Sequence, residues 1–363
     1  MSKKKQKKQG SGLLGRIVRR FFLTLFTIVI LLVVGLSLVM NLVFNGPSPA
    51  ARDVLTMSLL EPSATKWIPG LFMDEEIVES IRNAGKENEI QEEQNLDDIV
   101  IMDANTMAAS DEWAAYPDGI RIESYSGKTF NAHIMLIQDP SRVYLGLSSY
   151  DGFSTSKPGK RLNVAIEDEG ASAAINAGAF NDDGTANASV GSIPAGLTIH
   201  GGQVVSDQYK GLVPEKGFCG FHTDNKLVVA ETMTAQQAME QNIRDGCEFG
   251  PVLIINGVPN QKVYSGNSGY NPRTVVGQRA DGVVIFVCAD GRQAGSLGAT
   301  YKDMIDILVS YGAVNACNMD GGSSSIMLYR NYQTGEVEMV NSYSVLQSEP
   351  RRMPNFWMVK PLQ

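Results

Sequence analysis

The residues from Phe21 to Phe44 form a run of 24 side chains without a charge. As a helix, at about 1.5 Å per residue, this run is about 36 Å long, which is enough to cross the hydrocarbon core of a bilayer. Residues 1–20 carry eight Lys or Arg side chains and no acid, and the positive-inside rule places such a flank in the cytoplasm. We therefore expect a cytoplasmic tail (1–20) and a transmembrane anchor (21–44), with the rest of the chain extracellular.

A cleaved signal peptide is the alternative interpretation of the same run. The small residues of "SPA", Ser48 to Ala50, have the spacing that a signal peptidase recognises. The apolar run is longer than the roughly 7 to 15 residues that are usual in such a signal. Its length favours an uncleaved, single-pass anchor in the cell membrane, and both interpretations export the rest of the chain.

The charge distribution argues against nucleic acid as a partner. The whole chain has 31 basic and 39 acidic residues, a net charge of −8. Without the eight basic residues of the tail, 23 basic residues remain against the same 39 acids, so the rest of the chain carries −16. Such a domain repels a phosphate backbone, whereas a basic tail beside a membrane span is typical of contact with anionic lipid. The expected partner of residues 21–44 is therefore the lipid bilayer.

The amino-acid composition of the chain changes twice after the apolar run. Residues 45–117 are interpreted as an extracytoplasmic linker or stalk, because the acidic stretch Asp74–Asp98 is poor in turn residues and is most simply solvated. Short β-rich runs separated by Gly, Asn and Asp begin near residue 118, and "INGV" at Ile255–Val258 is a strong hairpin signal. We predict an α+β fold at residues 118–363, a mixed β-sheet domain with a few helices, preceded by the transmembrane helix and the stalk.

The cysteines permit two disulfides in an exported chain, but their spacing does not require them: Cys219, Cys247, Cys288 and Cys317. Buried thiols fit their strand-like surroundings equally well. Neither a CxxC motif nor a His-rich spacing indicates zinc, and the histidines are scattered: His133, His200 and His222. The sequence requires no cofactor, although its acids leave open a divalent cation such as calcium.

One predicted helix lies between two Asp-Gly turns. Thr300 has the position of an N-cap, Asp303 follows three residues later, and Gly312 stands where the helix would end. Strand-like segments precede "ADG" and "MDGG" on either side of this helix. If the two strands are parallel, Asp290 and Asp320 lie at carboxyl ends on the same side of the sheet. Each Asp-Gly is otherwise a simple turn, but a facing pair of carboxylates suits glycoside cleavage.

Two further segments add polar groups. In "NPRTVVG", Arg273 precedes a β-branched strand, and its guanidinium can fork onto a phosphate or simply form a salt bridge. In "INAGAFNDDG", a buried-looking strand ends at Asn176 and continues through Gly178 into a polar turn. The chain has no P-loop lysine and no GxSxG serine, which disfavours nucleotide hydrolysis and esterase chemistry.

Taken together, these motifs resemble the phosphodiester glycosidase family. The resemblance is carried by "NAGAF", "PVLIINGVP", "NPRTVVG", "ADGR", "VNACNMDGGSSS" and "RRMPN", and it covers roughly residues 120–362. Two segments depart from the family pattern: Asn-Gly-Gly-Phe-Phe reads Asn-Ala-Gly-Ala-Phe here, and the third glycine after Asp320 is Ser323. Both replacements are small, so the turns are expected to survive while the sugar pocket differs.

The resemblance implies hydrolysis of a sugar C1–O–phosphate bond in a glycosyl-phosphate or polysaccharide substrate. Asp320 is the first choice for nucleophile or base, Asp290 for its partner or for a contact to sugar hydroxyls, and Arg273 for the phosphate clamp. Substrate contacts are expected from Asn176, Gly178, Thr274, Gly291, Arg292, Asn318, Gly321, Gly322, Ser323 and Ser324.

Two other hypotheses are compatible with the sequence. The altered "NAGAF" favours an accessory protein that binds carbohydrate, or assists exopolysaccharide assembly, without turnover. The third hypothesis is an adhesion domain in which the acids ligate calcium.

Overall fold

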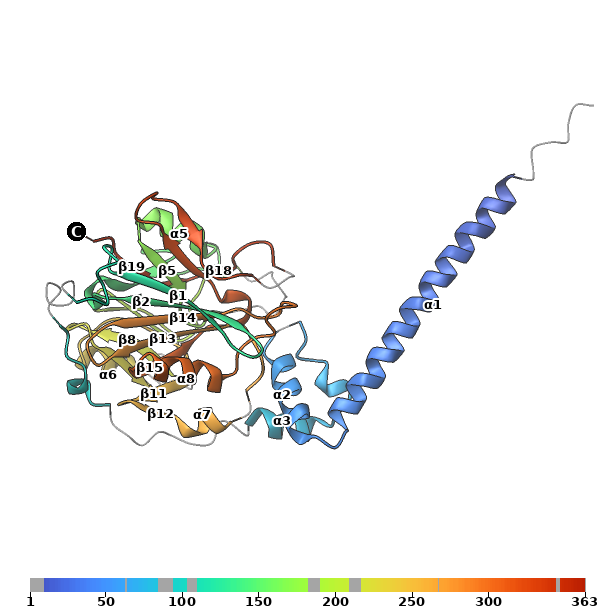
Figure 1. Cartoon of the computed structure of the whole chain (residues 1–363), viewed down its shortest axis with the longest axis horizontal. Coiled ribbons are helices and arrows are strands. Elements are labelled where there is room, and N and C mark those ends of the chain that lie inside the picture. The colour runs from blue at the N-terminus through green and yellow to red at the C-terminus, as the bar shows by residue number, and fades with distance from the viewer. Residues whose placement is uncertain are drawn as a thin grey trace, which may run out of the picture.

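The computed structural model describes residues 10–62, 64–83, 94–102, 110–181, 190–208, 217–266, 268–343 and 347–362. The first nine residues of the basic tail and residues 84–93 of the acidic stretch lie outside the described residues. Helix α1 (Gly10–Phe44) leads away from a β-rich body, and short helices lie at its base (Figure 1). Residues 15–44 of α1 are long and apolar enough to cross a membrane, a test that a signal sequence also passes.

The β-rich body confirms the α+β class. Its largest sheet has seven strands in the order β1-β2-β14-β13-β15-β11-β12, and two further sheets have the orders β7-β6-β10-β8-β9 and β17-β16-β5-β19-β3. The strands of the first sheet are β1 (Ile120–Ser126), β2 (Asn131–Ile137), β11 (Val252–Ile255), β12 (Val258–Pro259), β13 (Arg273–Arg279), β14 (Val284–Ala289) and β15 (Ala313–Met319). The other two sheets consist of β3 (Val143–Leu147), β5 (Ala173–Asn176), β6 (Leu197–His200), β7 (Gln203–Asp207), β8 (Phe218–His222), β9 (Leu227–Ala230), β10 (Ile243–Glu248), β16 (Met327–Arg330), β17 (Val337–Met339) and β19 (Asn355–Val359). The short strands β4 (Lys160–Arg161) and β18 (Arg352–Met353) pair with each other.

The main hydrophobic core lies where the three sheets face one another. It joins Phe286 of the first sheet, Phe221 of the second and Trp357 of the third. The rings of Phe221 and Trp357 meet edge to face at 5.5 Å, an arrangement that aromatic pairs favour. The cysteines are buried here as free thiols, so the disulfide alternative is not realised: Cys219, Cys247, Cys288 and Cys317. Burial raises the pKa of Cys219, Cys247 and Cys288, which keeps these thiols protonated.

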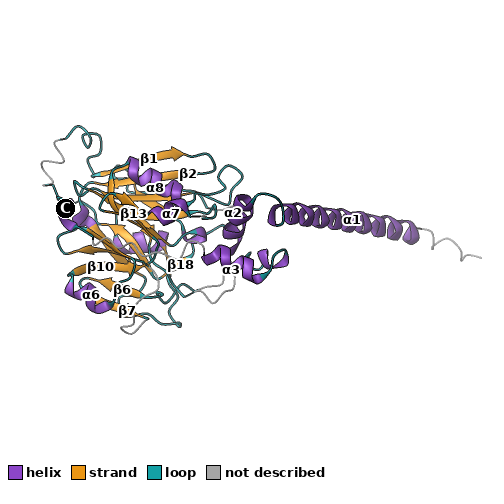
Figure 2. Cartoon of the chain, turned by 90° about the horizontal axis from the view of Figure 1, so that it is seen from below, coloured by secondary structure: helices purple, strands orange, loops and turns teal. Residues whose placement is uncertain are grey.

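Helices cover the outer faces of the sheets (Figure 2). They are α5 (Leu162–Glu169), α6 (Ala235–Glu240), α7 (Gln261–Ser265) and α8 (Tyr301–Ser310). The predicted capping box of α8 is confirmed, since the Thr300 hydroxyl accepts from the Asp303 N–H and the Asp303 carboxylate accepts from the Thr300 N–H. Its apolar face, with Met304 and Leu308, packs on the first sheet. The expected hairpin is also present, with Asn256 and Gly257 at positive φ between β11 and β12.

Strand β13 separates the two strands that α8 connects. It pairs antiparallel with β14 on one side and with β15 on the other, so β14 and β15 run in the same direction. Asp290 follows the last residue of β14, and Asp320 follows the last residue of β15. Because β13 runs the other way, its first residue, Arg273, lies at the same edge, paired with Ala289. The prediction that both aspartates lie on one side of the sheet is confirmed, and Arg273 joins them.

The helices that follow α1 form a small unit, which we call the juxtamembrane module (residues 40–83). It consists of the end of α1, helix α2 (Pro49–Leu60), the 3₁₀ turn Pro69–Leu71 and helix α3 (Glu75–Asn83). Its own core contains Phe44, Met73, Val78 and Ile81. Both views show α2 between the base of α1 and the β-rich body (Figures 1 and 2).

Candidate functional site

Chain segments from three regions of the sequence meet at the edge where β14 and β15 end. The loop after β5 joins it because β19 pairs with β5 in antiparallel register, so Asn355 at the start of β19 lies close to the "NAGAF" loop. The Oδ1 atom of Asn355 accepts the Gly178 N–H at 2.9 Å. The Asp320 N–H donates to the Ala177 carbonyl at 3.0 Å. The family-like motifs, far apart in sequence, are therefore neighbours in space.

Asn176 holds the backbone of Asp320 in place. It is fully buried, and its Nδ2 donates to the Asp320 carbonyl at 2.6 Å. Its Oδ1 accepts from the Thr274 hydroxyl at 2.8 Å and from the Ile326 N–H at 3.2 Å. Asn176 thereby ties β5, β13 and the turn after β15 together. These contacts fit a positioning role behind Asp320 better than direct contact with a substrate.

The Gly321-Gly322 turn presents the Asp320 carboxylate. Its Oδ1 accepts the Gly321 N–H at 2.9 Å, and the Gly322 N–H donates to the Pro272 carbonyl at 2.9 Å. Gly322 has a φ of +60°, and a Cβ there would lie 3.0 Å from the guanidinium of Arg292. Only glycine takes this conformation without strain, which also allows the arginine to lie directly over the turn.

The guanidinium of Arg292 lies against this turn, with its Nη1 3.2 Å from the position of a Cβ at Gly322. Its φ of +56° is unusual for a residue with a side chain and is typical of constrained functional positions. Its Nη2 donates to Oδ1 of Asn271 at 3.0 Å. Burial lowers the pKa of Arg292, and the neighbouring Arg273 lowers it further, while Glu61 and Asp320 act in the opposite direction. Arg292, Arg273, Asp320 and Glu61 therefore form one electrostatic cluster.

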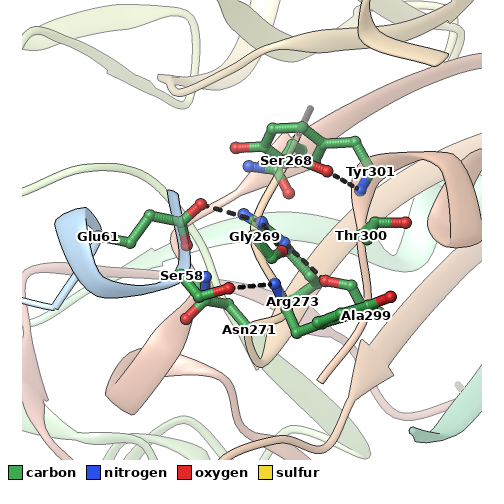
Figure 3. A network of polar contacts seen from close by, with 12 residues as sticks. Ser58, Glu61, Ser268, Gly269, Asn271, Arg273, Ala299, Thr300 and Tyr301 are labelled. Carbon is green, nitrogen blue, oxygen red and sulfur yellow. Dashed lines mark hydrogen bonds and ion pairs between the residues drawn. The ribbon is translucent and has the colours of Figure 1, made fainter. Parts of the chain in front are cut away.

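Arg273 is buried and already has a full set of partners (Figure 3). Its Nη2 donates to a carboxylate oxygen of Glu61 and to the Gly269 carbonyl, both at 2.9 Å, and its Nε donates to the Ala299 carbonyl at 3.2 Å. The guanidinium lies 4.1 Å above the ring centroid of Tyr301. Burial alone lowers the pKa of Arg273, but Glu61 and Tyr301 outweigh it and leave the pKa raised.

Glu61 reaches the site from the juxtamembrane module. It follows α2 directly, and the Ser58 hydroxyl on the last turn of α2 accepts the Tyr270 N–H at 2.9 Å. A Cβ at Gly269 would lie 2.4 Å from the Ser58 nitrogen, so the loop and the helix are in close backbone contact. Figure 3 shows Ser58 and Glu61 beside Arg273. A residue that follows α2 is thus built into the polar edge of the domain.

Asp290 is buried at the same edge, with its carboxylate engaged elsewhere. Its Oδ1 accepts the Ser342 N–H at 2.8 Å, and its Oδ2 lies 3.5 Å from Nε2 of His133. His133 is placed there because β2 pairs with β14, opposite Cys288. The Asp290 carboxylate thus contacts Ser342 and His133, whereas Asp320 belongs to the arginine cluster.

Several buried polar atoms at this edge have no hydrogen-bond partner among the described residues. They are Nδ2 of Asn271 and of Asn355, Oδ1 of Asn318, and the hydroxyls of Ser324 and Ser325. A buried polar group without a partner costs about 1–3 kcal/mol, so such groups are rare in the absence of a function or of water. These atoms are the buried polar groups at this edge that the described residues leave without a hydrogen bond.

The remaining expected contacts lie at the same edge. The Thr274 hydroxyl is committed to Asn176, Nδ2 of Asn318 donates to the Gly250 carbonyl at 2.9 Å, and a Cβ at Gly291 would lie 2.6 Å from the Pro272 nitrogen. The Ser323 hydroxyl lies 3.4 Å from Nη1 of Arg351, whose guanidinium is 4.8 Å from the ring of Phe180.

Sequence reasoning missed four residues at the site: Glu61, His133, Asn271 and Arg351. Asn271 and Arg351 belong to the motifs that carry the family resemblance and could have been named from them. Glu61 and His133 reach the site only through tertiary contacts, so no local sequence pattern could have identified them.

Among the described residues, no group of three or more His, Cys, Asp or Glu side chains is arranged to hold a metal ion. The calcium hypothesis thus has no support from such a cluster in that part of the chain.

Comparisons with known proteins agree on the fold and the family. The model of the phosphodiester glycosidase family matches residues 169–360. The SPbeta prophage-derived uncharacterized protein YomE of Bacillus subtilis (strain 168) is 27% identical over 203 residues, which is 54% of this chain and 29% of that protein. The chain thus spans under a third of that relative's length.

A solved structure shares the fold. It is the catalytic domain of zebrafish N-acetylglucosamine-1-phosphodiester alpha-N-acetylglucosaminidase, described as auto-inhibited by its pro-peptide. The match has a TM-score of 0.52 at 18% identity and covers 66% of this chain and 82% of that one.

Proposed function

This chain belongs to the phosphodiester glycosidase family, and on that basis we propose that it hydrolyses the C1–O–phosphate bond of a glycosyl phosphodiester. The products are a free sugar and a phosphomonoester. The observation that carries the proposal is the cluster of Asp320 with Arg273 and Arg292 around the Gly321-Gly322 turn. A carboxylate beside cations and unpaired buried donors matches a reaction in which an oxocarbenium-like centre separates from a phosphate.

The contacts support the following proposed roles. Asp320 acts as nucleophile or base, because its carboxylate is held by its own turn and its backbone is fixed by Asn176. Arg292 and Arg273 stabilise the phosphate, which is already a stable anion and needs a clamp more than a strong acid. Asp290 orients the site through Ser342 and His133 or binds sugar hydroxyls.

The assay uses the full chain in detergent with N-acetylglucosamine α-phosphodiesters, and released sugar and phosphomonoester are measured together. Equimolar release of both products supports the proposal. Binding of the phosphodiester without product would instead support the accessory carbohydrate-binding function that the altered "NAGAF" suggested.

We further propose that α1 remains in the membrane as a single-pass anchor, with its basic end in the cytoplasm and the domain outside. In intact cells, external protease should then remove the domain while a tag before Lys3 stays protected. Labelling of that tag from outside would reverse the orientation, and a mature chain beginning at Ala51 would show cleavage.

The Glu61 contact suggests that the juxtamembrane module restrains the site. Its carboxylate takes the place on Arg273 that a substrate phosphate would use, at 2.9 Å from Nη2. The zebrafish catalytic domain is described as auto-inhibited by a pro-peptide, and we propose that Glu61 competes with substrate in this chain. A partly exposed ion pair contributes up to about 1 kcal/mol, so Glu61→Gln should raise kcat/KM by about fivefold.

The matched control is Glu79→Gln, which removes an acid from α3 of the same module, where it pairs with Arg82. That variant should retain wild-type kinetics. If Glu61→Gln leaves kcat/KM unchanged or lowers it, Glu61 supports the site and does not compete for it.

A further inference from the structure

The juxtamembrane module fixes one short turn against the end of α1. The ring of Phe44, the last residue of α1, stacks on Phe72 at 5.3 Å and 22°. Nδ2 of Asn45 donates to the Phe72 carbonyl at 3.2 Å. Phe44 is 2% exposed, so this contact belongs to a packed core. The residues next to Phe72 are therefore held beside the point where α1 ends.

Two large apolar side chains on this turn face solvent. Trp67 is 60% exposed and Leu71 is 66% exposed, although other residues of the module pack inward. The indole N–H of Trp67 donates to the Ala64 carbonyl at 2.8 Å, so the exposed part of the ring is apolar. Lys66 is exposed beside it. Tryptophan with leucine and a nearby lysine is the composition of a segment at a membrane–water interface.

We propose that Trp67 and Leu71 lie in the outer interface of the bilayer that α1 spans, with Lys66 among the headgroups. Continuity with α1 selects the bilayer as the occupant, because the stack of Phe44 on Phe72 places this surface at the end of the span. The acids Glu75 and Glu76 at the start of α3 are exposed, so the part of the module beyond this turn faces water.

This contact limits how far the candidate site lies from the membrane. Trp67 follows Glu61 by six positions in the sequence, so the two residues are at most about 22 Å apart even in an extended chain. Glu61 contacts Arg273 directly. If the proposed hydrolase function holds, the site acts on glycosyl phosphates carried by lipids of the same membrane, whose sugar–phosphate bond lies within that reach.

Fluorescence tests the docking without reference to activity. The chain has three tryptophans, and Trp113 and Trp357 are 4% and 0% exposed. In nanodiscs of phosphatidylcholine and phosphatidylglycerol with brominated acyl chains, the full chain should lose part of its tryptophan emission relative to ordinary lipid. Trp67→Phe should abolish that difference. Equal emission in both lipids would overturn the docking.

An activity comparison tests the consequence for substrate. The double variant Trp67→Ser, Leu71→Ser should lose at least about tenfold in hydrolysis of a lipid-borne glycosyl phosphate in the nanodisc, which is about 1.4 kcal/mol, while hydrolysis of a soluble phosphodiester is unchanged. Val258→Ser, exposed on the β11–β12 hairpin, is the control and should match the wild type on both.

The two proposals fail in different ways. Equal losses on lipid-borne and soluble substrates would overturn the membrane-held substrate class. Quenching of Trp67 by brominated lipid without hydrolysis of either substrate would retain the docking and refute the hydrolase function.

Discussion

Asp320→Asn is expected to lower turnover by at least about a hundredfold, the lower limit of what a positioned acid or base contributes. The substitution keeps the size of the side chain, and its Oδ1 can still accept the Gly321 N–H. The backbone carbonyl also keeps its bond to Asn176. The melting temperature and the affinity for the phosphosugar should therefore stay close to those of the wild type, while kcat falls.

Two further variants make this result interpretable. Asp306→Asn removes an exposed acid that pairs with Lys302 on α8, and it should have no effect on kcat. Asp290→Asn retains the acceptor for Ser342 but weakens the contact with His133. Near-normal turnover in Asp320→Asn would refute the catalytic assignment. A collapsed melting temperature would show that Asp320 is mainly a turn residue.

The placement of Asp290 and Asp320 could be predicted because it depends on local signals. A capped helix between two strands implies a crossover, and a crossover returns the second strand in the direction of the first. The insertion of β13 between them could not be predicted, because strand order is decided by contacts far apart in sequence. This insertion brings Arg273 to the same edge as the aspartates.

The packing of α2 against the β-rich body could not be predicted from amino-acid composition. The segment after α1 is rich in acids farther along, which favours a solvated stalk. The structure packs the end of α2 on the loop before Arg273, because Gly269 leaves room for the helix backbone. Glu61 lies before the acidic stretch, between Leu60 and Pro62, and no sequence feature there distinguishes a partner of a buried arginine from a solvated side chain.

Arg273→Lys is expected to reduce both stability and activity. A lysine keeps the charge but cannot contact Glu61, Gly269 and Ala299 together, as the planar guanidinium does. Loss of two hydrogen bonds from a charged donor costs about 3 kcal/mol or more, which lowers the melting temperature by about 6–12 °C for a domain of this size. Arg279→Lys, at the other end of β13, is the control and should cost less, because Arg279 is partly exposed.

The kinetics of Arg273→Lys distinguish a clamp from a purely structural arginine. If substrate phosphate displaces Glu61, the kcat/KM of Arg273→Lys should fall beyond what the loss of folded protein explains. It should also fall when Arg273→Lys is combined with Glu61→Gln, because the guanidinium that binds the phosphate is then missing. A structural arginine would give a different cycle: Arg273→Lys and Glu61→Gln would couple in melting temperature, while the kcat/KM of the folded fraction would remain that of the wild type. The second outcome would remove Arg273 from the catalytic site and leave Arg292 as the phosphate ligand, since its guanidinium lies over the turn that carries Asp320.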